Sequence, residues 1–328
     1  MNNSEKIMVS ICCIAYNQEQ YIEQALDSFL MQKTNFKYEI IIHDDLSTDR
    51  TTSIIQKYEK MYPDIIKPIY QKENQYSKGI IVSQFAYKKA RGKYITVCEG
   101  DDYWSDENKL QKQFDFLETH KEYIATSHWC EVVNKEGFPS EEYPNKYRVF
   151  NFKKHNYELK DYKKNEIPGH INTLMFRNIY LDSKYDFSKI YYASRLVGDR
   201  TAYLILALNG NIYVMHEFMS CYRFVVENNG TNYCSKVKDK NQFYDWYKYY
   251  TNLENAVQDV MNKTVSLKAL KYEAFVNAII KYIKSPNNEN KNILNKIYKE
   301  TNKVENLYYL PVAIVNRIIK FIASKVFS

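Results

Sequence analysis

Two pairs of adjacent aspartates are the residues of this sequence best suited to do chemistry. Asp44-Asp45 and Asp101-Asp102 each follow a short apolar segment. Carboxylates at the end of a buried segment are costly unless a positive partner is present. Carboxylate oxygens are preferred ligands of Mg²⁺ and Mn²⁺, whose remaining positions are commonly filled by water and phosphate oxygens. Asp101-Asp102 therefore predicts a site for a divalent metal and a diphosphate, whereas a helix cap or a turn is the alternative explanation for either pair.

The segments around these residues alternate between strand and helix patterns. Strands are predicted over residues 9–15, 38–43, 65–70 and 94–98, and helices over residues 22–32, around 54–58 and over 82–90. Ser47 or Thr48 is expected to cap the second helix. The alternation predicts a doubly wound α/β sheet, in which ligands bind beyond the carboxyl ends of the strands. Tyr16-Asn17 and both aspartate pairs follow three of these strands, so we expect all of them at that edge.

The pattern changes in the second half of the chain. A stretch rich in Tyr, Lys and Asn, from about Phe138 to Lys164, predicts a long loop or a poorly regular excursion. Regular patterns return at residues 173–176, in a helix over 201–208 and in a strand over 211–215. From about residue 236 the sequence is helical in character. We therefore expect an α/β domain over residues 1–232 and a helical region over residues 233–328.

The segment after Pro311 has an amphipathic helical pattern. Its apolar face carries Val312, Val315, Ile318, Ile319, Ile322 and Val326, and its polar face Asn316, Arg317, Lys320 and Ser324. A basic amphipathic helix suits an anionic membrane surface, and packing against the protein itself explains the pattern equally well. No run of about 18 uncharged apolar residues occurs, so no membrane span is expected. The first ten residues do not resemble a signal peptide.

Composition narrows the class of protein. The chain has 328 residues, 45% hydrophobic and 26% charged, which is typical of a folded protein with one large domain or two modest ones. Six cysteines without C-x-x-C spacing indicate thiols in a reducing compartment. None of the eight glycines forms a G-x-G motif, which disfavours both the dinucleotide fingerprint and the P-loop. The net charge of +7 is modest, so nucleic acid is not an expected partner.

Three ordered motifs resemble those of a known family. They are VSICCIAYNQEQYIEQALDSFLMQ, EIIIHDDLSTDRT and ARGKYITVCEGDDYWSDENKL. Together they resemble the family 2 glycosyltransferases, which are inverting enzymes of the GT-A fold. The resemblance is close up to about residue 120 and continues more thinly to about Thr231. It implies a Rossmann-like mixed sheet, here followed by a C-terminal helical extension.

The resemblance also implies roles for individual residues. The nucleotide sugar is expected to bind at Ala15, Tyr16, Asn17 and Asp45, with Asp101 near the ribose. Asp102 is expected to bind the metal, Mn²⁺ or Mg²⁺. Family members often complete the metal shell with a histidine where this chain has Val225, and His170 or His216 is a candidate substitute.

A later segment, Val197-Gly198-Asp199-Arg200, resembles the family's acidic catalytic motif at the start of a helix. Asp199 is therefore the candidate general base, which takes the proton of an acceptor hydroxyl as that hydroxyl attacks the anomeric carbon. Arg200 stands where the family usually has an aromatic residue. A helix N-cap is the alternative role of Asp199.

The resemblance implies an inverting, metal-dependent transferase that moves a sugar from a nucleotide donor, with UDP favoured, to a hydroxyl of a glycan or a lipid-linked saccharide. Such enzymes build bacterial surface polysaccharides, such as capsule or lipopolysaccharide, in the cytoplasm, and the basic amphipathic end suits contact with the inner face of the plasma membrane. One alternative is a transferase-like domain that has lost turnover and only binds sugar nucleotides or glycans. A nucleotidyltransferase is a weaker alternative, because Ala15-Tyr16-Asn17-Gln18 is not the Gly-rich basic loop that it needs.

Overall fold

The computed structural model describes residues 6–140, 150–181, 183–194, 196–225, 241–301 and 303–326. The chain forms two compact units. The first comprises Met1–Tyr162, Glu166–Lys184 and Ala202–Val225, and the second comprises Lys163–Asn165, Tyr185–Thr201 and Val226–Ser328. The expected boundary after Asn232 lies outside the described residues.

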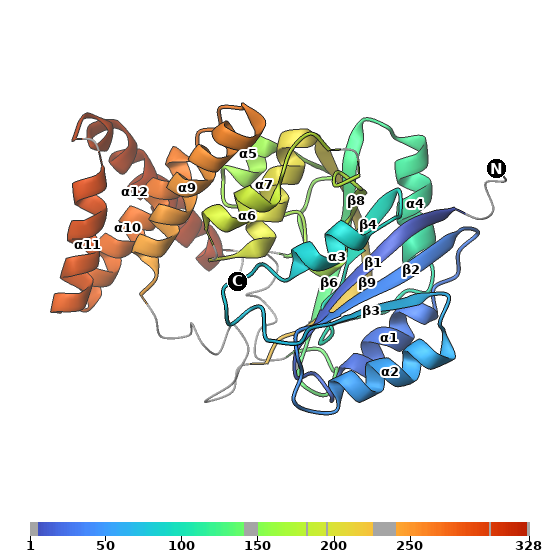
Figure 1. Ribbon diagram of the computed structural model, residues 1–328. Coiled ribbons are helices and arrows are strands. Elements are labelled where there is room, and N and C mark those ends of the chain that lie inside the picture. Colours follow the sequence, from blue (N-terminus) through green and yellow to red (C-terminus); the bar gives the residue numbers. More distant parts are fainter. Residues whose placement is uncertain are drawn as a thin grey trace. The chain divides into compact units, whose positions relative to one another are not determined.

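Four parallel strands form one half of the sheet in the first unit (Figure 1). In spatial order they are β3 (Ile66–Tyr70), β2 (Lys37–Asp44), β1 (Ile7–Ala15) and β4 (Tyr94–Val97). Most of β1 is buried on both faces, as expected for a central strand covered by helices on both sides. The four predicted strands are thus confirmed, with ends that differ by only one or two residues.

The other half of the sheet is mixed. From β4 it continues through β8 (Met175–Arg177), β6 (Tyr123–Val133), β9 (Asn211–Arg223) and β5 (Tyr103–Trp104), while β7 (Asn156–Tyr157) also pairs with β9. β9 extends well past the predicted end at Met215, because it pairs with β6 along its length. Within the stretch predicted as a loop or a poorly regular excursion, residues 141–149 lie outside the described residues, and residues 150–164 are poorly regular, with only β7 and the short helix α5 (Leu159–Tyr162). Tyr157 and Tyr162 are fully buried there, so tertiary packing orders this polar stretch.

Helices cover both faces of the parallel strands (Figure 1). On one face lie α1 (Ile22–Leu30), α2 (Thr51–Met61) and α4 (Lys109–Thr119), which share one apolar cluster with β1 and β2. On the other lies α3 (Ser83–Lys89), where Phe85 stacks on His43 with ring centres 5.0 Å apart. The predicted doubly wound sheet is therefore confirmed.

The second unit is helical. It contains α6 (Ser188–Ala193), α9 (Phe243–Met261), α10 (Lys268–Lys284), α11 (Asn288–Glu300) and α12 (Lys303–Val326). α10 packs against α9, α11 and α12 around a core that includes Tyr247, Phe275 and Ile297. α7 (Gly198–Asn209) starts in this unit and continues into the first. The predicted helical C-terminal region is confirmed.

α12 begins before Pro311, which lies inside the helix, so the amphipathic segment after this proline is the second part of a longer helix. Leu310 and Ala313 pack against the core of the second unit. By contrast, Val312, Val315 and Ile318 are 56%, 53% and 51% exposed. One side of α12 thus packs on the protein while apolar side chains on another side remain exposed. Within the described residues, no helix is long and apolar enough to cross a membrane.

Candidate active site

The carboxyl ends of β1, β2 and β4 meet at one edge of the sheet. Ala15 pairs with Asp44 across β1 and β2, and the backbone N–H of Asp45 donates to the carbonyl of Ala15 (3.1 Å). On the other side of β1, the N–H of Gly100 donates to the carbonyl of Ile14 (3.0 Å). Because β1 is central, the segments after all three strands lie together, as the sequence predicted.

Asn17 joins the segment after β1 to the one after β2. Its backbone is in the left-handed region (φ 53°), which asparagine tolerates better than most residues. Its N–H donates to Ser47 Oγ (3.0 Å), and its Oδ1 accepts from the N–H of Thr48 (2.8 Å). The predicted nucleotide-binding residue Asn17 thus holds two loops together, and the neighbouring Tyr16 is left 43% exposed at the edge.

Asp44 and Asp45 both stabilise loops in this structure. Asp44 Oδ1 accepts from the N–H and the hydroxyl of Ser47 (3.0 and 2.6 Å). The expectation that Ser47 or Thr48 caps the second helix is wrong, because both are occupied in this turn and α2 begins only at Thr51. The carboxylate of Asp45 is buried and accepts from the N–H groups of Gln75 (2.8 Å) and Tyr76 (2.9 Å). Asp45 therefore fixes the segment after β3 at the same edge.

Asp102 is buried as deeply as Asp45. Its Oδ1 accepts from the N–H of Arg223 (2.9 Å), and its Oδ2 accepts from Asn172 Nδ2 (2.9 Å). Burial raises the pKa of Asp102 well above its usual value, and the negative charges of Asp101 and Glu99 raise it further. Burial also raises the pKa of the partly exposed Asp101, against the opposing charge of Arg223. A bound cation would favour the ionised form of each acid, so the loop is electrostatically suited to a metal ion.

Arg223 organises the loop that carries these acids. Its Nε donates to the carbonyl of Asp101 (3.0 Å), and its Nη2 donates to Gln24 Oε1 (2.6 Å). The guanidinium also lies 4.5 Å from the centre of the Tyr21 ring. No role was predicted for Arg223 from the sequence. Asn172 was missed altogether, because nothing local marks a polar residue in a short 3₁₀ turn as a partner of Asp102.

Of the two candidate histidines, only His170 lies beside Asp102. Its Nδ1 is 3.5 Å from Asp102 Oδ2, and its ring stacks on Tyr222 at a centroid distance of 4.1 Å. Burial lowers the pKa of His170 to about 4, so the imidazole is neutral at pH 7. Its Nδ1 accepts from the N–H of Asn172 (3.4 Å), and this bond has to be given up if Nδ1 is to bind a metal. His216 instead stacks on Trp129 and His155.

The residues at this edge fit a partial metal shell. Among the described residues, no group of three or more His, Cys, Asp or Glu side chains is arranged to hold a metal ion by itself. Asp102 can supply a carboxylate ligand and His170 lies close enough to add a nitrogen ligand, so phosphates and water would have to fill the remaining positions of the ion.

Asp199 belongs to the second unit, in the first turn of α7. The helix begins at Gly198, so Asp199 lies inside the first turn and the N-cap alternative is wrong. A negative charge is favourable there because of the helix dipole. Burial raises the pKa of Asp199 to about 6, although the charge of Arg200 opposes the shift. A carboxyl group with this pKa is largely ionised at pH 7 and still basic enough to accept a proton.

The doubly wound sheet with carboxylates at its carboxyl edge agrees with the fold expected of a GT-A glycosyltransferase. Among solved structures, Staphylococcus aureus TarS (residues 1–349, in complex with UDP-GlcNAc) shares the fold with a TM-score of 0.60 at 16% identity, over 89% of this chain and 79% of that one. Residues 10–185 match the family described as "Glycosyl transferase family 2". The chain belongs to this family.

Curated relatives are similar to part of this chain. The uncharacterized protein Rv1520 of Mycobacterium tuberculosis is 42% identical over 137 residues, which are 42% of this chain and 39% of the relative. The putative teichuronic acid biosynthesis glycosyltransferase TuaG of Bacillus subtilis is 38% identical over 34% of this chain and 42% of its own length. The Escherichia coli UDP-Glc:alpha-D-GlcNAc-diphosphoundecaprenol beta-1,3-glucosyltransferase WfaP is 38% identical over 37% of this chain and 46% of its own length. The chain thus spans less than half of each of these relatives.

Proposed function

We propose that this protein is an inverting, metal-dependent glycosyltransferase that uses a nucleotide sugar, with UDP as the favoured nucleotide. Its acceptor is a hydroxyl of a glycan or lipid-linked saccharide in the synthesis of a surface polysaccharide. The observation that carries the proposal is the acidic pair Asp101-Asp102, with Asp102 buried, held by Arg223 and Asn172 at the carboxyl edge of the sheet. The names of TuaG and WfaP and the UDP-GlcNAc complex of TarS support the choice of substrates.

The donor is assigned to the first unit. The base binds beside the exposed ring of Tyr16, on the rim formed by Ala15 to Asn17 and by Asp45. Asp101 would contact the ribose, and Asp102, with His170, would hold Mg²⁺ or Mn²⁺. A metal held there would supply positive charge that offsets the charge on the departing diphosphate.

Asp199 is assigned as the general base. It accepts the proton of the acceptor hydroxyl while the hydroxyl oxygen bonds to the anomeric carbon. The bond from that carbon to the diphosphate oxygen breaks on the opposite face, so the configuration inverts and a nucleoside diphosphate leaves. A base in this role contributes a factor of about 10²–10⁴ to the rate.

A series of thermal unfolding measurements tests the donor site. UDP, GDP, dTDP and CDP are each added with and without Mn²⁺ to the native protein, to Asp102→Asn and to the control Asp115→Asn, which changes an exposed acid of α4. A ligand at about 100 times its dissociation constant adds about 2.7 kcal/mol to the free energy of unfolding. We expect metal-dependent stabilisation by UDP in the native protein and the control, and none in Asp102→Asn. No stabilisation by any nucleotide would overturn the donor site.

A binding protein without turnover is the second candidate, because Arg200 and Val225 depart from the family pattern. Hydrolysis of the donor without acceptor separates the two functions. Steady release of UDP from a UDP-sugar, abolished in Asp102→Asn and retained in Asp115→Asn, excludes a pure binding role. If the protein binds the UDP-sugar but releases no UDP, with or without acceptor saccharides, the result favours the binding protein.

The exposed side of α12 supports contact with an anionic membrane, which would place the enzyme at the inner face of the plasma membrane. Leu307 is 77% exposed and, like Val312 and Val315, offers apolar surface, while Arg317 is exposed nearby. The double variant Val312→Ser/Val315→Ser should sediment less with vesicles that contain phosphatidylglycerol. The control Ile283→Ser changes an apolar residue of α10 that is 72% exposed and should sediment like the native protein. Equal sedimentation of all three proteins would contradict membrane contact through α12.

A further inference from the structure

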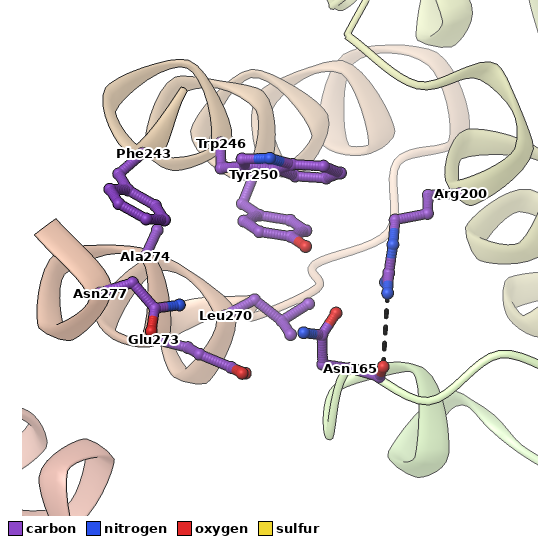
Figure 2. A pocket seen from close by; sticks show the side chains of 9 residues that line it. All are labelled: Asn165, Arg200, Phe243, Trp246, Tyr250, Leu270, Glu273, Ala274 and Asn277. Carbon is purple, nitrogen blue, oxygen red and sulfur yellow. Dashed lines mark hydrogen bonds between the residues drawn. The ribbon is translucent and has the colours of Figure 1, made fainter. Parts of the chain in front are cut away.

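The second unit contains a pocket of its own, with a volume of about 170 Å³ (Figure 2). It lies between α9 and α10, next to Arg200 at the start of α7 and to Asn165. A cavity of about 150 Å³ is enough for one benzene molecule, so this pocket has room for a single six-membered ring. None of the residues assigned to the donor site lines it.

Aromatic side chains of α9 form one side of the pocket. Phe243, Trp246 and Tyr250 lie on consecutive turns, and Figure 2 shows Phe243 and Tyr250 directed toward α10 and the Trp246 ring directed toward Arg200. The Trp246 and Tyr250 rings are 5.9 Å apart and inclined by 30°. Flat apolar surfaces of this kind suit the C–H face of a sugar ring, which packs on them without losing hydrogen bonds to water.

Polar groups approach the pocket from three other segments. Glu273 and Asn277, four residues apart on α10, share a helix face there. Arg200 Nη2 donates to the carbonyl of Asn165 (3.3 Å), which fixes these two residues against each other. Asn165 Oδ1 is buried and has no hydrogen-bond partner among the described residues, and Figure 2 shows its side chain directed into the pocket. A buried acceptor of this kind is costly unless a ligand donates to it.

The charges of the lining favour a neutral ligand. The positive charge of Arg200 lowers the pKa of the Tyr250 hydroxyl and the negative charge of Glu273 raises it, so one cation and one anion both lie near this hydroxyl. A phosphate or a carboxylate would be attracted by the first and repelled by the second. A nucleobase presents its polar atoms along its edges in one plane and needs an open face for stacking. A pyranose carries hydroxyls around the whole ring, which matches polar groups that come from α7, α10 and Asn165.

We propose that this pocket binds one neutral pyranose unit of a saccharide, with its C–H face on the α9 rings. Its hydroxyls donate to Asn165 Oδ1 and to the carboxylate of Glu273, and they accept from Arg200 and from Asn277 Nδ2. The binding site itself does not depend on the proposed function. The identification of the sugar as a unit of the acceptor glycan does rest on it, because Arg200 directly follows the proposed base Asp199.

Saturation-transfer NMR on the full chain tests the site with methyl glycosides of glucose, galactose, mannose and N-acetylglucosamine, and with cellobiose and chitobiose. We expect transfer to the ring C–H protons of at least one saccharide, unchanged by UDP with Mn²⁺. Asn165→Gly removes the orphan acceptor and keeps the left-handed backbone (φ 67°), so it should weaken saccharide binding about tenfold. The matched control Asn262→Gly changes another left-handed asparagine of this unit (φ 51°), outside the pocket, and should bind normally. Asn277→Ala, in a helix that tolerates alanine, is a second variant expected to lose affinity.

The outcomes separate this site from the proposed function. If UDP binds and is released from its sugar but no saccharide shows transfer, the pocket proposal is wrong and the transferase proposal stands. If saccharides bind and Asn165→Gly weakens them while no nucleotide binds, the pocket stands and the donor site is wrong. Equal binding by Asn165→Gly and Asn262→Gly would place the saccharide elsewhere. Binding of uridine that Asn165→Gly weakens would make the pocket a base site instead.

Discussion

Lys109 offers a quantitative test of the packing behind the acidic loop. Its ammonium group is fully buried and donates to Thr96 Oγ1 (3.1 Å) and to Gln113 Oε1 (2.8 Å). It also lies 4.1 Å from the centre of the Trp104 ring. Since these neighbours are neutral, burial lowers the pKa of Lys109 from 10.5 to about 7.

This lowering makes stability depend on pH. Each pKa unit corresponds to about 1.4 kcal/mol, so the charged amine destabilises the folded state by up to about 5 kcal/mol. Between about pH 7 and pH 10.5 the unfolded chain holds this proton and the folded chain has lost it. The free energy of unfolding therefore rises with pH through that window. Below pH 7 both states are protonated, and the contribution no longer changes.

Lys109→Met removes the titration and keeps an unbranched side chain, although Gln113 Oε1 loses a donor. Urea denaturation, followed by tryptophan fluorescence between pH 6.5 and 9.5, compares the variant with the native protein, so that the titration of all other groups cancels. The variant should be the more stable protein at pH 7, and its advantage should shrink by about 1.4 kcal/mol per pH unit above that. Lys112→Met is the control, because acidic partners raise the pKa of Lys112 and no slope is expected in this range. A pH-independent difference between Lys109→Met and the native protein would refute the argument.

Further predictions concern catalysis, the acidic loop and the sheet. Because the pKa of Asp199 is about 6, kcat/KM should fall below pH 6, where the base is protonated. The variant Asp199→Asn should lower kcat by about 10²–10⁴, while UDP should still raise the unfolding temperature of this variant. Arg223→Lys should weaken metal-dependent UDP binding by about tenfold in calorimetry, since lysine lacks the guanidinium group that holds the carbonyl of Asp101 and the side chain of Gln24. An unchanged affinity for UDP would contradict the positioning role of Arg223. Gly92→Ala should lower the free energy of unfolding by about 1–3 kcal/mol in urea titrations, because a Cβ there would lie 2.5 Å from the backbone nitrogen of Ser10. If the variant is as stable as the native protein, the backbone at Gly92 moves away from β1 easily, and the argument is wrong.

The parallel half of the sheet and its acidic edge could be predicted from sequence. The apolar runs of β1, β2, β3 and β4 and the helical spacing between them are local signals, and parallel strands necessarily bring their carboxyl ends to one edge. The sequence therefore located Asp45 and Asp101 correctly in the fold. It missed β6 and most of β9, because these strands stabilise each other through pairing between distant segments.

The partners of the acidic residues were decided only by the tertiary structure. Asp102 is held by Arg223 and Asn172, which are 121 and 70 positions away in the sequence, and no local pattern links such residues. The same holds for His170, which lies next to Asp102, and for His216, which does not. Residue spacing indicates which face of a helix or strand is buried. The partner of a buried polar group depends instead on which distant segment of the chain packs against it in the tertiary structure. The sequence thus determined where the acids gather, and the fold determined what holds them there.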